Sequence, residues 1–184
     1  MKHNAAVFFF SILLASCAAS LPYPIDYPLT RETFQSYDGV LRGQVPQGWF
    51  VSAGDSLVPD LLVWLIKEDY TTTITIRELK LNGLSEQYVR QKGLSVLANL
   101  SYSLLSDKSL TDSHKLDITE FKMGDKEFCS YEIKDAGNQR RIVLFTIGGK
   151  YYECEARFLK GKLSETERLR LFTIQQSVLS SMIF

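Results

Sequence analysis

The sequence is poor in histidine and has no excess of either charge. Of its 184 residues only 2 are histidines, and 21 Lys and Arg are balanced by 21 Asp and Glu. A metal site needs three or four converging ligands, and a nucleic-acid-binding surface needs clustered basic residues. The composition therefore argues against a nucleic-acid partner, and it predicts neither a metal nor any other cofactor.

The motifs that mark common catalytic sites are also missing. There is no G-x-S-x-G, H-E-x-x-H, P-loop or Rossmann glycine pattern. His114 lies in a polar loop, TDSHKLD, where a solvated histidine is the simpler interpretation than a metal ligand. Glu153, Glu155 and Arg157 alternate along one predicted strand, and we expect them to face water rather than to act as an acid–base pair. The sequence therefore predicts a protein that is not an enzyme.

A long hydrophobic run is likewise absent, because the apolar stretch from Ala5 to Leu14 is interrupted by Ser11. A bilayer-spanning helix needs about 20 apolar residues, whereas the h-region of a signal peptide needs about 7 to 15. The stretch ends in Leu-Ala-Ser-Cys, residues 14–17, which resembles the lipobox of bacterial lipoproteins. The sequence therefore predicts a lipoprotein signal peptide.

The lipobox resemblance implies that the thiol of Cys17 is joined to diacylglycerol and that signal peptidase II cleaves between Ser16 and Cys17. Further acylation of the new amine, for example with palmitate, gives two or three chains, which hold a protein firmly on a membrane. The alternative is an ordinary signal peptide cleaved within SCAAS, with Cys17 incidental. We expect a cell-envelope protein that faces the periplasm. Ala18, where an aspartate would retain the protein in the inner membrane, slightly favours the outer membrane.

The chain divides into a signal peptide (1–16), a lipidated cysteine with a proline-rich tether (17–36) and one domain (37–184). Removing the signal leaves 184 − 16 = 168 residues and 21 − 1 = 20 basic against 21 acidic side chains, so attachment depends on the lipid. The tether has no helical or strand period, and fully extended it would reach roughly 60 Å at about 3.1 Å per residue. We interpret Tyr23 and Tyr27 as parts of this spacer rather than as a partner motif.

Within the domain, hydrophobic periodicity predicts strands, one helix, four more strands and a final helix. A Pro-Gln-Gly turn separates the first two strands, and apolar or β-branched runs predict strands at 61–69 and 71–79. Residues 84–107 have a helical period, with one predicted apolar face: Leu84, Tyr88, Val96, Leu97, Leu100 and Leu104. The last helix begins with a Ser164-x-x-Glu167 capping box, and its predicted apolar stripe is Leu169, Phe172, Leu179 and Ile183.

The element order, the VPQGWFV stretch at residues 45–51 and the late RRIVLFTIGGKYYECEARF hairpin together resemble the PsbP fold. That resemblance implies an α+β domain, with a central antiparallel sheet of about six to seven strands and helices on both faces. The doubly apolar runs at 61–66 and 142–147 fit strands that are covered on both faces. The family shares no catalytic set, so the resemblance implies binding or stabilisation.

The sequence is compatible with two functions. The first is a non-catalytic accessory of an envelope or membrane complex, bound to a protein partner and attached through its N-terminal lipid. The alternative is a carrier or receptor for a small apolar ligand in a pocket between helix and sheet. The candidate binding surface consists of four aromatic residues: Trp49, Phe50, Phe128 and Tyr151. Trp49 and Trp64 are both expected to be largely buried.

Cys129 and Cys154 are predicted not to form a disulfide, although the periplasm would favour one. Pairing Lys134 with Arg140 sets Cys129 opposite Phe145, on the same sheet face as Cys154. A strand would then lie between the two thiols and separate them by roughly 9–10 Å. Because a disulfide needs Cα atoms within about 7 Å, both cysteines are expected to be free and buried.

Overall fold

The computed structural model describes residues 20–52, 60–105, 116–135, 138–160 and 164–183. A seven-stranded antiparallel sheet has the order β3-β4-β5-β9-β8-β7-β6, and β1 and β2 pair separately. The strands are β1 Leu29–Gln35, β2 Arg42–Pro46, β3 Trp49–Val51, β4 Leu61–Lys67, β5 Thr72–Leu79, β6 Thr119–Met123, β7 Lys126–Asp135, β8 Asn138–Ile147 and β9 Lys150–Phe158. The helices are α1 Gly83–Lys92, α2 Leu94–Leu105 and α3 Glu165–Ser181.

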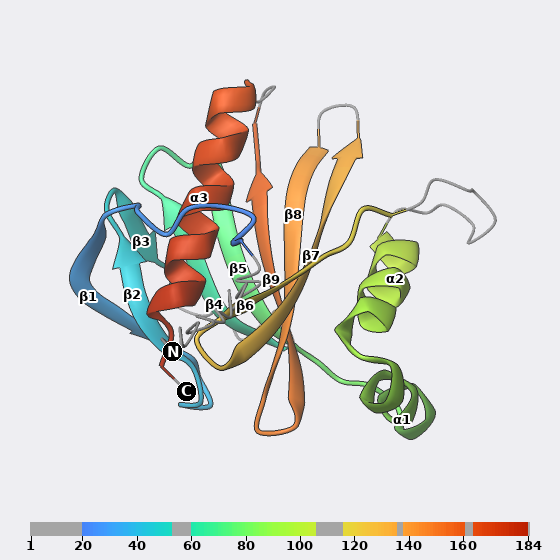
Figure 1. The fold of residues 1–184 in the computed structure, drawn as a ribbon. Helices are drawn as coiled ribbons and strands as arrows, with labels where there is room; N and C mark the ends of the chain where they lie inside the picture. Colours follow the sequence, from blue (N-terminus) through green and yellow to red (C-terminus); the bar gives the residue numbers. More distant parts are fainter. Residues whose placement is uncertain (1–19, 53–59, 106–115, 136–137, 161–163, 184) are drawn as a thin grey trace, which may run out of the picture.

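Helix α3 lies on one side of the large sheet, and α1 and α2 lie on the other (Figure 1). Strand β8 shows why both sides are apolar: Val143 and Phe145 pack toward α3, whereas Ile142 and Leu144 pack toward α2. The predicted α+β class, with helices on both faces of an antiparallel sheet, is confirmed. A doubly buried strand is confirmed for β8 but not for β4, where Trp64 and its same-face neighbour Ile66 are half-buried.

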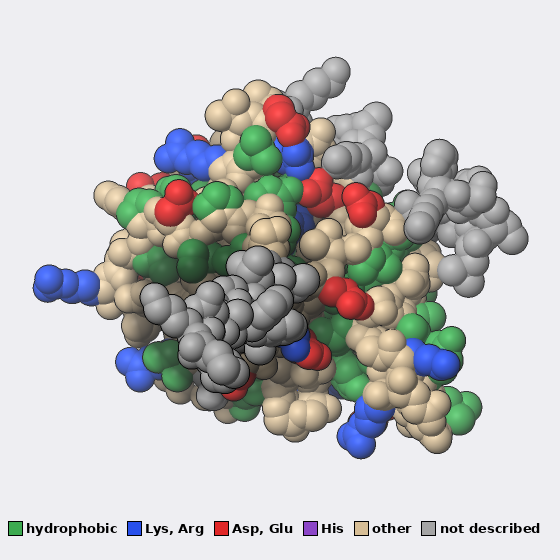
Figure 2. Space-filling view, viewed as in Figure 1, with side chains coloured by type: hydrophobic (Ala, Val, Ile, Leu, Met, Phe, Trp, Pro, Cys, Tyr) green, Lys and Arg blue, Asp and Glu red, His purple; other side chains and the backbone are tan. Residues whose placement is uncertain are grey.

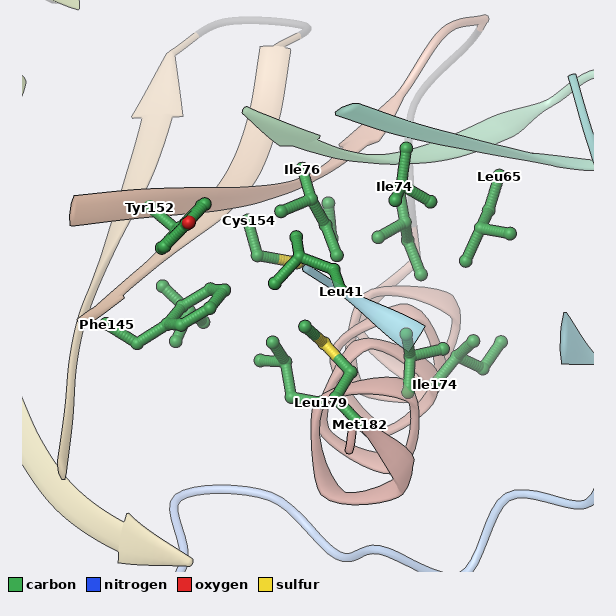
Figure 3. Packing of buried hydrophobic residues seen from close by; sticks show 14 of the residues in the cluster. Leu41, Leu65, Ile74, Ile76, Phe145, Tyr152, Cys154, Ile174, Leu179 and Met182 are labelled. Atoms are coloured by element: carbon green, nitrogen blue, oxygen red, sulfur yellow. The ribbon is translucent and has the colours of Figure 1, made fainter. Parts of the chain in front are cut away.

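The core between α3 and the sheet contains residues from strands far apart in the sequence (Figure 3). Helix α3 begins with the predicted capping box, in which Ser164 and Glu167 satisfy each other's backbone amides. Phe172 and Leu179 of the predicted stripe are buried, but Leu169 is 44% exposed and Ile183 is 71% exposed. The stripe was wrong at these positions because the helix also buries polar residues, Arg168, Gln175 and Gln176, that an apolar pattern omits.

The described part of the predicted extended tether, from residue 20 to residue 36, is not a spacer but belongs to the folded domain. Strand β1 pairs with β2 in antiparallel register, with Phe34 opposite Gly43. Before it, the N-terminal segment, residues 20–28, packs Leu21, Tyr23 and Tyr27 against the α3-side core. The sequence of this proline-rich segment did not predict the arrangement, because the segment is ordered by its contacts with the folded domain and has no local periodicity.

The single helix predicted at 84–107 is two helices, which are separated at Gly93. This glycine has φ 87° and ψ 179°, a conformation that is essentially restricted to glycine. The predicted apolar face is confirmed at Leu97, which is buried against the sheet together with Val89 and Ala98. It was wrong at its exposed members, because the break rotates the second half relative to the first; these are Leu84, Tyr88, Leu100 and Leu104.

The meander of β6 to β9 is confirmed, with one change of register. Cys129 lies opposite Leu144 rather than Phe145, so its side chain points to the α2 side, while Cys154 points to the α3 side. Both cysteines are free and buried. The two thiols are therefore separated by the sheet itself and not by a strand within one face. Burial raises the pKa of each thiol to about 12, which keeps both protonated and unreactive.

Candidate functional site

The structure does not bring the four predicted aromatic residues together. Trp49 and Phe128 are buried in the α3-side core, and Tyr151 is buried on the α2 side of the sheet. Phe50 is half-buried, with its ring centroid 5.7 Å from that of Tyr70. The predicted surface is thus mostly core, because strand aromatics pack inward on both faces of this sheet.

Several predictions fall outside the described residues, namely Ser16, Cys17 and His114. Among the residues that are described, no three His, Cys, Asp or Glu side chains converge as metal ligands. Nor does any described helix have the length and apolarity required to cross a membrane.

Glu153 and Glu155 were predicted to face water, and this prediction is wrong. They lie beneath α2 and are 4% and 7% exposed. Ser101 of α2 donates a hydrogen bond to Glu153 at 2.9 Å, and the Tyr131 hydroxyl donates to Ser101 at 2.7 Å. Burial raises the pKa of Glu153, and the Ser101 hydrogen bond opposes that rise. A raised carboxyl pKa alone would be compatible with acid–base chemistry.

The surroundings of these carboxylates indicate a structural role instead. Arg77 lies 3.8 Å from Glu153 and 3.7 Å from Glu155, and Arg140 lies 3.4 Å from Glu155. Arg140 also donates a hydrogen bond to the Leu105 carbonyl oxygen, 3.1 Å away at the end of α2. The charges are paired across β5, β8 and β9, and the hydrogen bonds of Ser101 and the Leu105 carbonyl attach α2 to this cluster.

A second polar centre lies on the α3 side, where Arg141 is 1% exposed. It donates hydrogen bonds to Gln175 at 3.2 Å and Gln176 at 2.9 Å, and no carboxylate in the described ranges pairs with it. Its charge lies 4.6 Å from the ring centroid of Tyr23 and 5.6 Å from that of Phe121. Burial lowers the pKa of Arg141 to about 10, so it stays charged at neutral pH.

Tyr23 attaches the N-terminal segment over this arginine. Its hydroxyl donates a hydrogen bond to Glu132, and its ring lies edge-on to Phe172 with a centroid distance of 5.4 Å. Arg168 of α3 donates to Glu132 at 2.8 Å and to the Tyr23 hydroxyl at 3.3 Å. Burial, followed by Glu132, raises the pKa of Tyr23 to about 12. Sequence periodicity gave no indication of this cluster, whose members come from four separate elements.

Tyr27 makes the second attachment of the segment. Its backbone N–H donates to Ser177 of α3 at 3.2 Å, and its hydroxyl donates to the Gln47 carbonyl at 3.0 Å. Arg170 of α3 lies over its ring, 5.8 Å from the centroid. The N-terminal segment is therefore held at two points, Tyr23 and Tyr27, on α3.

Beside Tyr27, a cavity of about 170 Å³ opens between α3 and the sheet. Thr72, Phe158, Leu171 and Ile174 are among its lining residues, and a larger, open groove of about 680 Å³ adjoins it at Lys67. The hydroxyl of Thr72 is buried without a hydrogen-bond partner among the described residues. The lining thus combines apolar side chains with charged ones, Lys67, Asp69, Glu167 and Arg170, and with the unpaired Thr72 hydroxyl.

The opposite side of the sheet exposes apolar side chains on both of its helices. Leu84 is 83% and Tyr88 51% exposed on α1, and Leu104 is 81% and Leu100 36% exposed on α2. We call these four residues the α1–α2 surface; hydrophobic side chains are visible there at the lower right of Figure 2. They belong to the face that periodicity assigned to the core. The pattern had detected apolar residues correctly, but it could not show that they lie on the outside.

No protein-family profile matches this sequence, and no curated protein sequence matches it either. Solved structures do match. The cyanobacterial PsbP protein CyanoP of Synechocystis sp. PCC 6803 has a TM-score of 0.57 and 12% identity, with 83% of this chain and 91% of that chain covered. The Ran-binding protein Mog1p of Saccharomyces cerevisiae has a TM-score of 0.57 and 12% identity, with 85% and 96% covered. The chain therefore has a PsbP-like fold.

Proposed function

We propose that this protein is a lipid-anchored lipoprotein of the cell envelope, in which the domain is a non-catalytic binding or stabilising accessory. In this proposal a protein partner docks on the α1–α2 surface. The observation that carries the proposal is the composition of α2: Leu94–Leu105 contains no charged residue, yet Leu100 and Leu104 are exposed.

A helix of largely apolar composition is normally buried. Helix α2 buries Leu97, Ala98 and Ser101 against the sheet but leaves Leu100 and Leu104 on the outside. Covering a leucine that is as exposed as Leu104 would contribute about 1.5–3 kcal/mol. An isolated exposed leucine is ordinary, but on α1 and α2 each exposed pair has a spacing of four residues, which places both members on one helix side.

The chemistry of the surface defines the partner that it fits. Since α2 offers no charge, the partner should present an apolar patch and not a charged one at the centre of the contact. The charged groups lie on α1, where Arg90 pairs with Glu86 at 2.7 Å. An apolar centre with a polar rim is the usual organisation of a protein–protein interface.

The membrane anchor in this proposal is Cys17. In its lipidation the thiol loses a proton, and its sulfur displaces the glycerol phosphate headgroup of a phospholipid, which gives a diacylglyceryl thioether. Water then hydrolyses the bond between Ser16 and Cys17. The support is the register of apolar run, small residues and cysteine in the sequence.

The test compares matched charge insertions on the full-length lipoprotein. Leu100→Glu/Leu104→Glu should remove a crosslinked complex from detergent-solubilised membranes, whereas Leu159→Glu, at a site 41% exposed, should leave its amount unchanged. Both variants should keep the melting temperature of the wild type. A complex that survives in the α2 variant, or that contains two copies of this chain and no other protein, would contradict the proposed docking.

The alternative function, a receptor for a small apolar ligand, is favoured by one observation: the cavity between α3 and the sheet, with its unpaired Thr72 hydroxyl. A cavity of about 150 Å³ holds a molecule the size of benzene. Hexanoate should then raise the melting temperature of the wild type, with Arg170 at the mouth of the cavity attracting its carboxylate. Ile174→Phe, which fills the cavity, should abolish that rise; an equal rise in both proteins would reject this site.

A further inference from the structure

The N-terminal segment leaves little free chain between the proposed lipid and the folded domain. Leu21 already packs against the α3-side core. From Cys17 to Leu21 there are 21 − 17 = 4 residues, which span at most about 14 Å when fully extended. The roughly 60 Å reach expected of an unattached tether is therefore not accessible while the segment stays bound.

We infer that the side of the domain carrying the N-terminal segment and the outer side of α3 lies directly on the phospholipid surface. The inference rests on the proposed lipidation of Cys17. Figure 1 shows the segment, in blue, crossing α3 on the side of the sheet away from α1 and α2. A lipid joined to Cys17 therefore brings this side, and not the α1–α2 surface, against the bilayer.

The side chains on this side fit a phospholipid interface. Ile25, within the segment, is 51% exposed, and Leu169, next to Arg168 on α3, is 44% exposed. Asp26 and Glu165 add exposed carboxylates, and Arg170 adds an exposed guanidinium over the Tyr27 ring, so charges of both signs lie on this side. The contact is thus suited to zwitterionic headgroups, with the covalent lipid as the main source of affinity.

The attachment of the segment determines the orientation. Tyr23 and Tyr27 hold it at two points on α3, through Arg168 and Ser177. Releasing Tyr23 would free the chain as far as Tyr27 and increase its reach. The orientation of the domain on the membrane should therefore be lost when the segment is released or lengthened, although the lipid remains.

The experiment uses the full-length lipoprotein in phosphatidylcholine vesicles that contain a lipid with a nitroxide on its headgroup. An environment-sensitive fluorophore is placed on Leu169→Cys or, as a matched control, on Leu84→Cys. The native thiols Cys129 and Cys154 are buried and remain unlabelled, and Cys17 is blocked by its lipid. We expect the probe at residue 169 to lose most of its fluorescence and the probe at residue 84 to keep it.

Two further proteins separate orientation from anchoring. A flexible Gly/Ser insertion of about 20 residues before Leu21, with a mean reach of about 25 Å, should reduce quenching at residue 169 to the level at residue 84. Tyr23→Ala should act in the same direction. Palmitate incorporation is measured in every sample: its absence rejects the lipid anchor itself. Full incorporation with equal quenching at both positions, or stronger quenching at residue 84, overturns the orientation and leaves the anchor in place.

Discussion

The two sides of the sheet are covered in different ways. On one side a single helix of 17 residues with a capping box is packed on the sheet and overlaid by the N-terminal segment. On the other side two shorter helices, of 10 and 12 residues, meet at Gly93 and expose four large apolar side chains. The α3 side is thus completed by the chain itself, whereas the α1–α2 side offers apolar area to another molecule.

The buried charged groups on the two sides of the sheet also differ in what surrounds them. Arg141 is shielded by Tyr23, a residue far away in sequence, so the α3 side depends on the N-terminal segment for a complete core. On the other side Glu153 and Glu155 are neutralised by Arg77 and Arg140 within the domain. Charges buried without an ionic partner are costly, which explains why aromatic and amide groups surround Arg141.

The largest expected contrast is between one core and one surface residue on the two sides. Phe172→Ala should lower the free energy of unfolding by about 3–5 kcal/mol, because it removes a buried aromatic side chain. Leu104→Ala should change it by less than about 0.5 kcal/mol, because that side chain is exposed. Urea denaturation of the mature domain measures both; a large loss in Leu104→Ala would mean that α2 packs through the side assigned to a partner.

A smaller contrast lies within the N-terminal segment. Tyr23→Ala should destabilise the domain by about 2–3 kcal/mol, since it uncovers the Arg141 guanidinium and removes a half-buried ring. Ile25→Ala, two residues away and largely exposed, should cost less than about 0.5 kcal/mol. Thermal unfolding followed by circular dichroism tests this pair. Equal small effects would restore the interpretation of this segment as a free tether.

The next largest effect on stability is expected at Gly93, between α1 and α2. Gly93→Ala should cost about 1–3 kcal/mol, because alanine is strained at this backbone conformation although space for its Cβ is available. Gly83→Ala, in the first turn of α1, should instead stabilise by up to about 1 kcal/mol. Chemical denaturation of both variants decides the point; a neutral Gly93→Ala would indicate that one continuous helix is accessible.

The smallest effect depends on pH. Burial raises the pKa of Glu153 above the ordinary value of 4.5, so the stability contributed by its protonated form is present below pH 4.5 and is lost as the pH rises through the folded-state pKa. The melting temperature of Glu153→Gln relative to that of the wild type should therefore be higher at pH 7 than at pH 4. The exposed Glu68→Gln is the control. A difference that grows toward low pH would show that the arginines, not burial, dominate this site.

Local patterns predicted strands β2 to β9, because alternation and glycine-containing hairpins are local properties, but they missed β1 and the register of β7 on β8. They failed where distant elements decide the outcome. The burial of Arg168, Gln175 and Gln176 in α3 depends on partners such as Arg141 and Glu132, which no helical period contains. Leu100 and Leu104 are the opposite case: they were predicted to be buried and are exposed. An apolar helix side does not indicate whether the chain itself or a partner covers it.

The most direct test of the whole account is site-specific photo-crosslinking of the full-length lipoprotein in its native membrane. A benzophenone amino acid replaces Leu104 in one protein and Leu169 in another, both at exposed positions on opposite sides of the sheet. The account predicts a discrete protein adduct from position 104 and phospholipid adducts from position 169. Phospholipid adducts from position 104 together with a protein adduct from position 169 would contradict it.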